Sequence, residues 1–252
     1  MKHWLPVHAA AVFTFLYLPL AVLVVFSVNS SRFTAWTGFS LDWYREMLRN
    51  PQLAEAAWNS IVIAAVATVI SVSAGTLAAY ALWKRTSRLL AGAVYLSLVT
   101  PEIVMGISLL AFFQWIFRHL DLRLGMHTVI LAHVSFTIAY VIVVVLARLR
   151  TLDGTLEEAA QDLGATEWQA FRTVTLPLLV PGIAAAGLLA FAVSFDDYVI
   201  TSMVAGVDSE TLPMVIYAMA RRGATPVLNA VSTAIVLAIG TLTLLSARLM
   251  RQ

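Results

Sequence analysis

Residues 151–177, TLDGTLEEAAQDLGATEWQAFRTVTLP, are the longest charge-bearing polar interruption in a chain that is otherwise mostly apolar. Thr155 and Glu158 have the S/T-x-x-E spacing of a capping box, which opens a helix. Gly164 is suited to the positive φ that ends a helix. The first half of this stretch therefore predicts a short helix that closes on a glycine corner.

A second short helix is predicted directly after the corner. Thr166 and Gln169 have the spacing of another capping box, which would open a helix over 167–174. Leu176 and Pro177 then lead into the next apolar segment, because proline is tolerated in the first turn of a helix. The whole stretch thus predicts a polar loop made of helix, corner and helix.

The chemistry of the first helix leaves two interpretations open. Ala159 and Ala160 form a small face that the groove of a partner protein could approach closely, and Glu158 could pair with an arginine there. Alternatively, this is an interfacial helix in which Glu158 only accepts hydrogen bonds from its own backbone.

The composition predicts an integral membrane protein. Of the 252 residues, 60% are hydrophobic and 12% are charged, and the mean hydropathy is +0.86, whereas soluble domains have about a quarter charged residues. There is no cysteine, which excludes disulfides and thiolate metal sites. Lysine occurs only at Lys2 and Lys84, and neither ends a GxxxxGK[ST] phosphate loop. If the work of this chain is driven by ATP, the ATPase is another polypeptide.

Six apolar segments have about the 20 residues that a spanning helix needs. They are 7–28, 58–82, 89–117, 127–147, 178–204 and 227–247. The first is longer than the ~7–15-residue core of a signal peptide. With interfacial helices near 41–49 and within 205–226, the chain is predicted to be all-α, with a single transmembrane domain over 1–252. The even number of spans puts both termini on one side, and a slight excess of Lys and Arg favours the cytoplasm for that side, which also carries 83–88 and 148–177. This excess alone does not decide the orientation, which depends on the identity of the polar loop.

Two local features stand out within the predicted spans. Ser71, Gly75 and Ala79 are small residues four apart, which lets helix backbones approach closely in lipid. Pro101 interrupts the third span, because it removes a backbone donor and disfavours helix at Thr100.

Three acids lie inside the apolar segments. At ~1.5 Å per residue, Asp196 is about 27 Å and Glu102 about 20 Å from the cytoplasmic end of its segment. A carboxylate at that depth normally faces a water-filled path or a partner, and the predicted helices offer no Lys or Arg to pair with it. We therefore predict that Glu102, Asp196 and Asp197 lie on a cation path, where Tyr198 could add a cation–π contact. Alternatively, Asp196 and Asp197 cap or bend their helix, and Glu102 caps the half-helix after Pro101.

No catalytic or metal-binding residue is predicted. His127 and His133 are six residues apart, which does not place both on one helix face, so neither is assigned to a site. The chain has no HExxH motif and no nucleophile and base at a defensible spacing.

Six residues of the polar loop follow a known pattern. They are Glu158, Ala159, Ala160, Gly164, Leu176 and Pro177. With Val174 in place of an isoleucine, they resemble the EAA loop of ABC importer permeases, which has EAA, three residues, G, nine residues and I-x-L-P. The resemblance implies the type I importer fold, in which this loop is a coupling helix seated in a groove of the cytoplasmic ATPase.

Three further stretches, 29–44, 100–110 (TPEIVMGISLL) and 194–197 (SFDD), resemble spermidine/putrescine importer permeases, and most the second of the two permeases in such systems. This resemblance implies a heterodimer with a second permease, two copies of an ABC ATPase that bind ATP and Mg, and a periplasmic solute-binding protein. It implies a bacterial inner-membrane location and polyamines as cargo. It implies no cofactor and no nucleic-acid partner for this chain.

Other functions stay open on the sequence. An importer permease could carry another small organic solute or a metal complex. A stand-alone channel or secondary transporter would be favoured by inverted repeats, and the two halves show none that is convincing. A membrane enzyme is disfavoured by the missing catalytic spacings.

Overall fold

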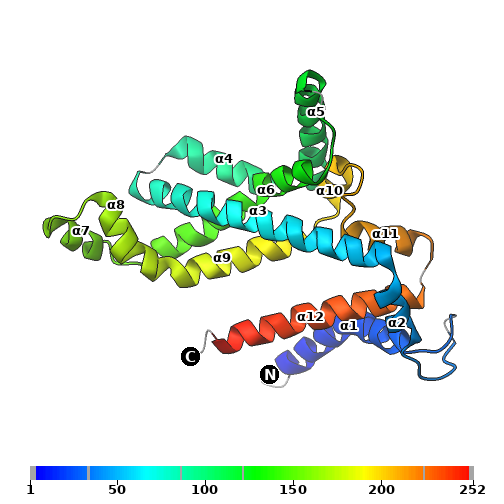
Figure 1. Cartoon of the computed structure of the whole chain (residues 1–252). Helices are drawn as coiled ribbons and strands as arrows, with labels where there is room; N and C mark the ends of the chain where they lie inside the picture. The colour runs from blue at the N-terminus through cyan, green and yellow to red at the C-terminus, as the bar shows by residue number, and fades with distance from the viewer. Residues whose placement is uncertain (1–3, 33–34, 86, 121, 224, 250–252) are drawn as a thin grey trace. The chain divides into compact units, whose positions relative to one another are not determined.

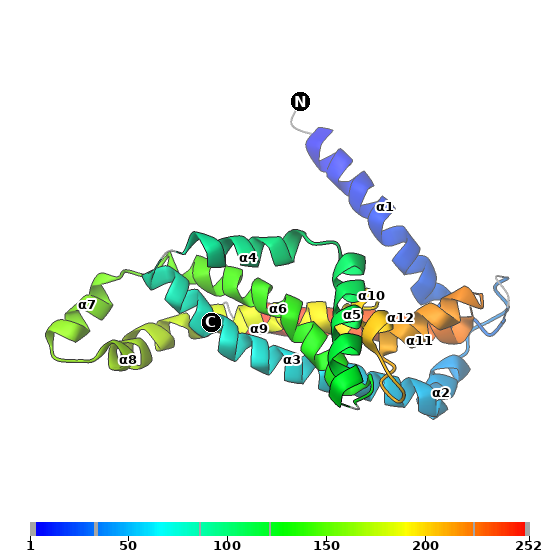
Figure 2. The same cartoon turned by 90° about the horizontal axis from the view of Figure 1, so that it is seen from above.

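The computed structural model of the protein describes residues 4–32, 35–85, 87–120, 122–223 and 225–249. The regular elements in this part of the chain are α-helices and one π-helix (Figure 1, Figure 2). The chain divides into two compact units: unit 1 combines residues 1–55 with 215–252, and unit 2 is 56–214. Helices α3 (Pro51–Lys84) and α11 (Leu212–Arg221) run across the division. That the chain is one functional domain stays a prediction.

Unit 1 is built on three helices. They are α1 (Trp4–Ser27), α2 (Asp42–Arg49) and α12 (Pro226–Leu249), and α12 packs against both others. Most of the described side chains of α1 are exposed although the helix is apolar, as expected of a helix whose surroundings are lipid. The interfacial helix expected near 41–49 is confirmed as α2.

Hydrogen bonds that are buried or partly buried join α2 to the chain at the end of α1. The indole Nε1 of Trp43 donates to the backbone oxygen of Asn29 at 2.7 Å. The hydroxyls of Ser27 and Tyr44 are 2.7 Å apart. These contacts explain why polar residues are buried where the chain leaves α1.

Unit 2 is a bundle of long helices. Besides most of α3 it contains α4 (Arg88–Val99), α5 (Glu102–Leu120), α6 (Met126–Leu149), α9 (Leu176–Asp196) and α10 (Val199–Val204). Helix α6 packs extensively against α9, and α10 packs against α5 and α6. The most buried apolar side chains, among them Val145, Leu149 and Leu179, fill the space between these helices.

The small face predicted on α3 is confirmed as a close helix contact. The Ser71 hydroxyl lies 2.7 Å from that of Thr137 on α6. A Cβ on Gly75 would lie 2.8 Å from Cγ1 of Val141, so only glycine fits there. Ala79 is fully buried in the same cluster.

Five helices of the described chain are long and apolar enough to span a membrane, which indicates a multi-pass protein. They are Pro6–Ser27, Pro51–Lys84, Glu102–Leu120, Met126–Leu149 and Glu167–Asp196. The predicted span 89–117 is two helices, as the break at Pro101 indicated, and only α5 is long enough to span. The predicted span 227–247 corresponds to α12, whose side chains are described as far as Thr241, so the count of six stays a prediction.

The polar loop lies at one end of unit 2, away from α10 (Figure 1, Figure 2). It contains α7 (Thr155–Asp162), α8 (Glu167–Ala170) and the π-helix η1 (Phe171–Thr175). The second helix begins at Glu167, as expected. It does not end at 174, because α8, η1 and α9 follow one another without a gap. Pro177 is tolerated since it sits in the first turn of α9, directly after the wider π-helical turn.

Candidate functional site

A cavity of about 620 Å³ opens in unit 2 where α4, α5, α6, α9 and α10 meet. This is within the roughly 300–1,000 Å³ typical of small-molecule sites. Its described lining includes all four residues predicted for the cation path: Glu102, Asp196, Asp197 and Tyr198. None of the lining residues is basic. The structure thus brings together acids from two segments that lie almost a hundred residues apart, and their role in transport stays a prediction.

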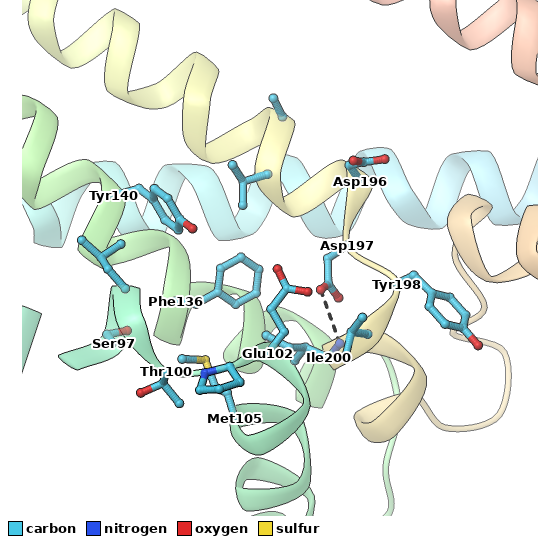
Figure 3. Close-up of a pocket in the computed structure, with 15 residues that line it drawn as sticks. Ser97, Thr100, Glu102, Met105, Phe136, Tyr140, Asp196, Asp197, Tyr198 and Ile200 are labelled. Atoms are coloured by element: carbon cyan, nitrogen blue, oxygen red, sulfur yellow. Dashed lines mark hydrogen bonds between the residues drawn. The ribbon is translucent and has the colours of Figure 1, made fainter. Parts of the chain in front are cut away.

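The break at Pro101 brings Glu102 to the cavity. Thr100 is extended, with φ −64° and ψ 126°, and its backbone N–H donates to the oxygen of Leu96. Helix α5 then begins at Glu102, which remains exposed. An acid in the first turn is favoured by the helix dipole, so the capping interpretation of Glu102 and a role in the cavity are compatible. Figure 3 shows its carboxylate extending toward the side of the cavity that carries Asp197.

A second helix break, at Asp197, brings the two aspartates to the cavity. The sequence predicted one helix over 178–204, but α9 ends at Asp196, and Asp197 is extended with ψ 126°. The Asp197 carboxylate accepts the backbone N–H groups of Ile200 at 3.3 Å and Thr201 at 2.8 Å. A short acidic side chain that captures backbone donors starts a new helix instead of continuing the old one. The capping interpretation therefore describes Asp197, whereas Asp196 is exposed at the cavity.

His133 is the residue of this region that the sequence interpretation missed. It is 1% exposed on α6, with Nδ1 2.7 Å from Ser194 Oγ and Nε2 2.8 Å from Thr201 Oγ1. Its Nε2 is also 3.5 Å from the Asp197 carboxylate. Asp197 thus has a partner, although it forms no ion pair with a Lys or Arg of the described residues. The available signal was a histidine in the middle of an apolar helix, which is costly unless it is paired.

The aromatic lining is also only partly as expected. Phe136 and Tyr140 of α6 form a wall of the cavity. Tyr198 lines the cavity, but Figure 3 shows its ring turned away from Glu102 and Asp197. A cation–π contact is therefore better placed on Tyr140 than on Tyr198.

The caps of the polar loop follow the sequence prediction in part. Thr166 Oγ1 accepts from the backbone N–H of Gln169 at 3.3 Å, and Gln169 Oε1 accepts from the backbone N–H of Thr166 at 2.8 Å. Gly164 has a φ of +92°, as the predicted corner requires. The expected box between Thr155 and Glu158 is wrong, because the residue before α7 is Gly154 and no side chain caps it.

The first capping box does not form because α7 begins one residue earlier than the box requires. Gly154 is at the cap position and Thr155 lies in the first turn. Asp153 binds Thr155 there: its Oδ1 accepts from the backbone N–H of Thr155 at 3.0 Å and from the Thr155 hydroxyl at 2.8 Å. These bonds lower the pKa of Asp153.

The residues of the EAA pattern face outward from the loop. Glu158, Ala159 and Gly164 are exposed, and Leu163 beside them is 91% exposed. The preceding Glu157 is instead 2% exposed. The two adjacent glutamates therefore have different surroundings, which the sequence alone did not reveal.

No metal site is evident in the described part of the chain, where no three His, Asp or Glu side chains are grouped to hold an ion.

Comparison with known proteins identifies the family. The family model for the binding-protein-dependent transport system inner membrane component matches residues 71–252. The chain is 43% identical over 235 residues to the putrescine transport system permease protein PotI of Escherichia coli K12, covering 90% of this chain and 84% of that protein. It is 38% identical over 226 residues to the spermidine/putrescine transport system permease protein PotC of Haemophilus influenzae, covering 88% and 86%.

Solved structures show the same fold at low sequence identity. A chain of a bacterial ABC transporter involved in the import of the acidic polysaccharide alginate superposes with a TM-score of 0.70 at 17% identity, covering 98% of this chain and 96% of that one. A chain of the MetNI methionine ABC transporter gives 0.66 at 18% identity, covering 79% and 94%. The expected type I importer fold is confirmed. The chain belongs to the family of binding-protein-dependent transport system inner membrane components, the membrane-spanning permeases of ABC importers.

Proposed function

We propose that this permease takes up polyamines such as putrescine or spermidine. The observation that carries the proposal is the cavity that Glu102, Asp196 and Asp197 line, with no basic residue among its described lining. Polyamines are ammonium groups separated by methylene chains. Acids would attract the ammonium groups, while Phe136 and Tyr140 would pack against the methylenes and add cation–π contacts.

The names of the relatives support the same cargo. PotI is a putrescine and PotC a spermidine/putrescine transport system permease protein, and both align with almost the whole of this chain. The alginate transporter has the same fold and an acidic cargo, so the fold is compatible with very different solutes. The acids in the cavity favour a cation.

We further propose the partners that would complete the importer. A second, similar permease forms a heterodimer with this chain in the bacterial inner membrane, and a periplasmic binding protein delivers the solute. Two copies of a cytoplasmic ABC ATPase bind ATP and Mg. The two termini and 151–177 face the cytoplasm, where α7 meets the ATPase.

The exposed side of the polar loop supports this last contact. Glu158, Ala159 and Ala160 present a small face, and Gly164 ends it. Leu163 would lose most of its exposed apolar surface in a groove of the ATPase, which favours association. Leu176 and Pro177 connect the loop to α9.

Uptake measurements test the cargo. In a strain lacking its own polyamine import, cells carrying the complete transporter should accumulate radiolabelled putrescine or spermidine. Asp196→Asn and Glu102→Gln each remove a charge from the cavity and should lower the initial uptake rate by about tenfold, the effect of one lost charge pair of moderate strength. Glu55→Gln, an exposed acid of unit 1, is the matched control. Unchanged uptake in both cavity variants would rule out the acidic path, and uptake of only a non-cationic solute would rule out the polyamine.

A second experiment tests coupling. Glu158→Arg reverses a charge on the exposed face of α7, and Gly164→Trp places a large side chain at a φ of +92° that side chains rarely adopt. Both should abolish ATP-driven uptake in the assembled complex in proteoliposomes. Intact uptake in either variant would show that the ATPase does not act through this surface.

A further inference from the structure

Glu157 is a buried acid in the polar loop with no place in the EAA pattern. It lies on α7 and is 2% exposed. Its Oε1 accepts from the Tyr80 hydroxyl at 2.6 Å and from Lys84 Nζ at 2.7 Å. Its Oε2 accepts from the Thr175 hydroxyl at 2.7 Å. Both carboxylate oxygens are therefore bonded by side chains of other elements.

These bonds join three elements at one carboxylate. Tyr80 and Lys84 are four residues apart in the last turns of α3, so they share a helix face. Thr175 is the last residue of η1, which continues directly into α9. Helix α9 in turn ends at Asp196 in the cavity wall. Glu157 thus connects α7 to two long helices, one of which reaches the cavity.

The charge of Glu157 is held in place by its partners. Burial alone would raise the pKa of Glu157, but the hydrogen bonds from Lys84, Tyr80 and Thr175 and the positive charge of Lys84 lower it below the ordinary value. Lys84 is fixed in turn, because its Nζ lies 5.1 Å from the ring centroid of Trp83. Removing one member of such a buried pair leaves the other charge without compensation, which is strongly unfavourable.

We infer that Glu157 is a positioning residue for coupling: its carboxylate ties α7 to the ends of α3 and α9, so that movement of α7 is passed on to both helices. This inference rests on the proposed coupling function of α7. It assigns different tasks to the two adjacent glutamates. The exposed Glu158 faces the partner, and the buried Glu157 holds α7 to its own bundle.

The experiment uses the complete transporter in proteoliposomes and measures solute uptake and ATP hydrolysis in the same vesicles. Glu157→Gln keeps the size of the side chain and removes its charge, and Lys84→Met keeps the length of the stem. Each should lower the amount of solute transported per ATP by about tenfold, the expected scale for a broken buried pair. Lys84→Arg, which keeps the charge and the donors, and Glu167→Gln, an exposed acid on α8, should stay within about twofold of the wild type.

A spectroscopic readout separates positioning from stability. The chain has no cysteine, so Asp162→Cys places one spin label on the exposed side of α7, in a complex whose other subunits lack reactive cysteines. Glu157→Gln should increase the mobility of this label while the complex stays assembled by size-exclusion chromatography. If Glu157→Gln prevents assembly, Tyr80→Phe supplies both readouts, because it removes one donor to the Glu157 carboxylate and leaves the compensating charge of Lys84 in place.

The outcomes distinguish the inference from the function on which it rests. A wild-type complex without ATP-driven uptake would overturn the proposed function. A wild-type complex that transports, together with a variant whose uptake per ATP or label mobility is unchanged, would overturn only the role of Glu157. A lower ratio with higher mobility, and recovery in Lys84→Arg, would support it.

Discussion

Replacing Gly75 by alanine tests the close contact of α3 with α6 on which unit 2 is built. A Cβ at this position would lie 2.8 Å from Cγ1 and 3.0 Å from Cβ of Val141, and 3.4 Å from the backbone oxygen of Ile138. Val141 is fully buried. Because a β-branched side chain in a helix is stiff at χ1, it cannot turn away from the new methyl group. The two helices would have to move apart.

Gly187→Ala is a matched control for this change. It adds the same methyl group to a helix of the same unit, but the new Cβ would lie 3.5 Å from Val72 Cγ2 and 3.9 Å from Thr68 Cγ2, which is ordinary contact. The gain in helix propensity, about 1 kcal/mol in water, is common to both variants and cancels in their difference. The remaining packing term should make Gly75→Ala less stable than Gly187→Ala by about 1–3 kcal/mol.

The assay is unfolding of the purified complex in detergent, by heat and by titration with a denaturing detergent, with the midpoints of the two variants compared directly. In the background of Val141→Ala, which removes the contact with Cγ1 at 2.8 Å but keeps the contact with Cβ at 3.0 Å, the extra cost of Gly75→Ala should become smaller without vanishing. Equal midpoints for Gly75→Ala and Gly187→Ala would refute the argument that glycine is required by this helix contact. A cost that is undiminished in the Val141→Ala background would show that the contact with Val141 Cγ1 is not its cause.

Four further variants and one pH series test other parts of unit 2. A Cβ on Gly206 would overlap a backbone carbonyl of the facing loop, so Gly206→Ala should destabilise the protein by about 3 kcal/mol or more and abolish a monodisperse peak in size-exclusion chromatography. His133→Leu leaves the buried Ser194 hydroxyl without its partner and removes one contact each of Thr201 and Asp197, so it should destabilise the protein by about 1–3 kcal/mol, seen as a lower melting temperature. Asp197→Asn should do the same, because it weakens the bonds from Ile200 and Thr201. The exposed Asp196→Asn should change uptake and leave the melting temperature unaltered. The folded-state pKa of Glu157 is below the ordinary value of 4.5. Its contribution to stability is therefore complete above that value and is lost only as the pH falls through the lowered pKa. The amount of solute transported per ATP should be constant between about pH 6 and 8, and a decline within that range would contradict the paired state of Glu157.

Comparison of the two breaks in unit 2 shows how far local sequence signals reach. The break before Glu102 was predictable, because proline acts on the residue beside it. The break at Asp197 was only one of two open interpretations, because an aspartate in an apolar segment is compatible with several helix ends. It becomes a helix start only where the backbone N–H groups of Ile200 and Thr201 turn toward its carboxylate.

The polar loop shows the same limit at shorter range. The boxes at Thr155 and Thr166 had equally good spacing, yet only the second forms. Helix α7 begins one residue earlier than the first box requires, so Thr155 lies in its first turn and Gly154 is at the cap position. A motif of fixed spacing does not show at which residue the helix begins.

The sequence by itself determined the membrane location, the approximate bounds of the long helices, the corner at Gly164 and the family, because these depend on composition and on residues close together in the chain. Only the tertiary structure decided which side chains of other helices pair with each acid. It paired Asp197 with His133 and buried Glu157 between Tyr80, Lys84 and Thr175. The physical reason is that these contacts join residues from different helices, and they form only when side-chain packing has fixed the distance and rotation of each helix against its neighbours.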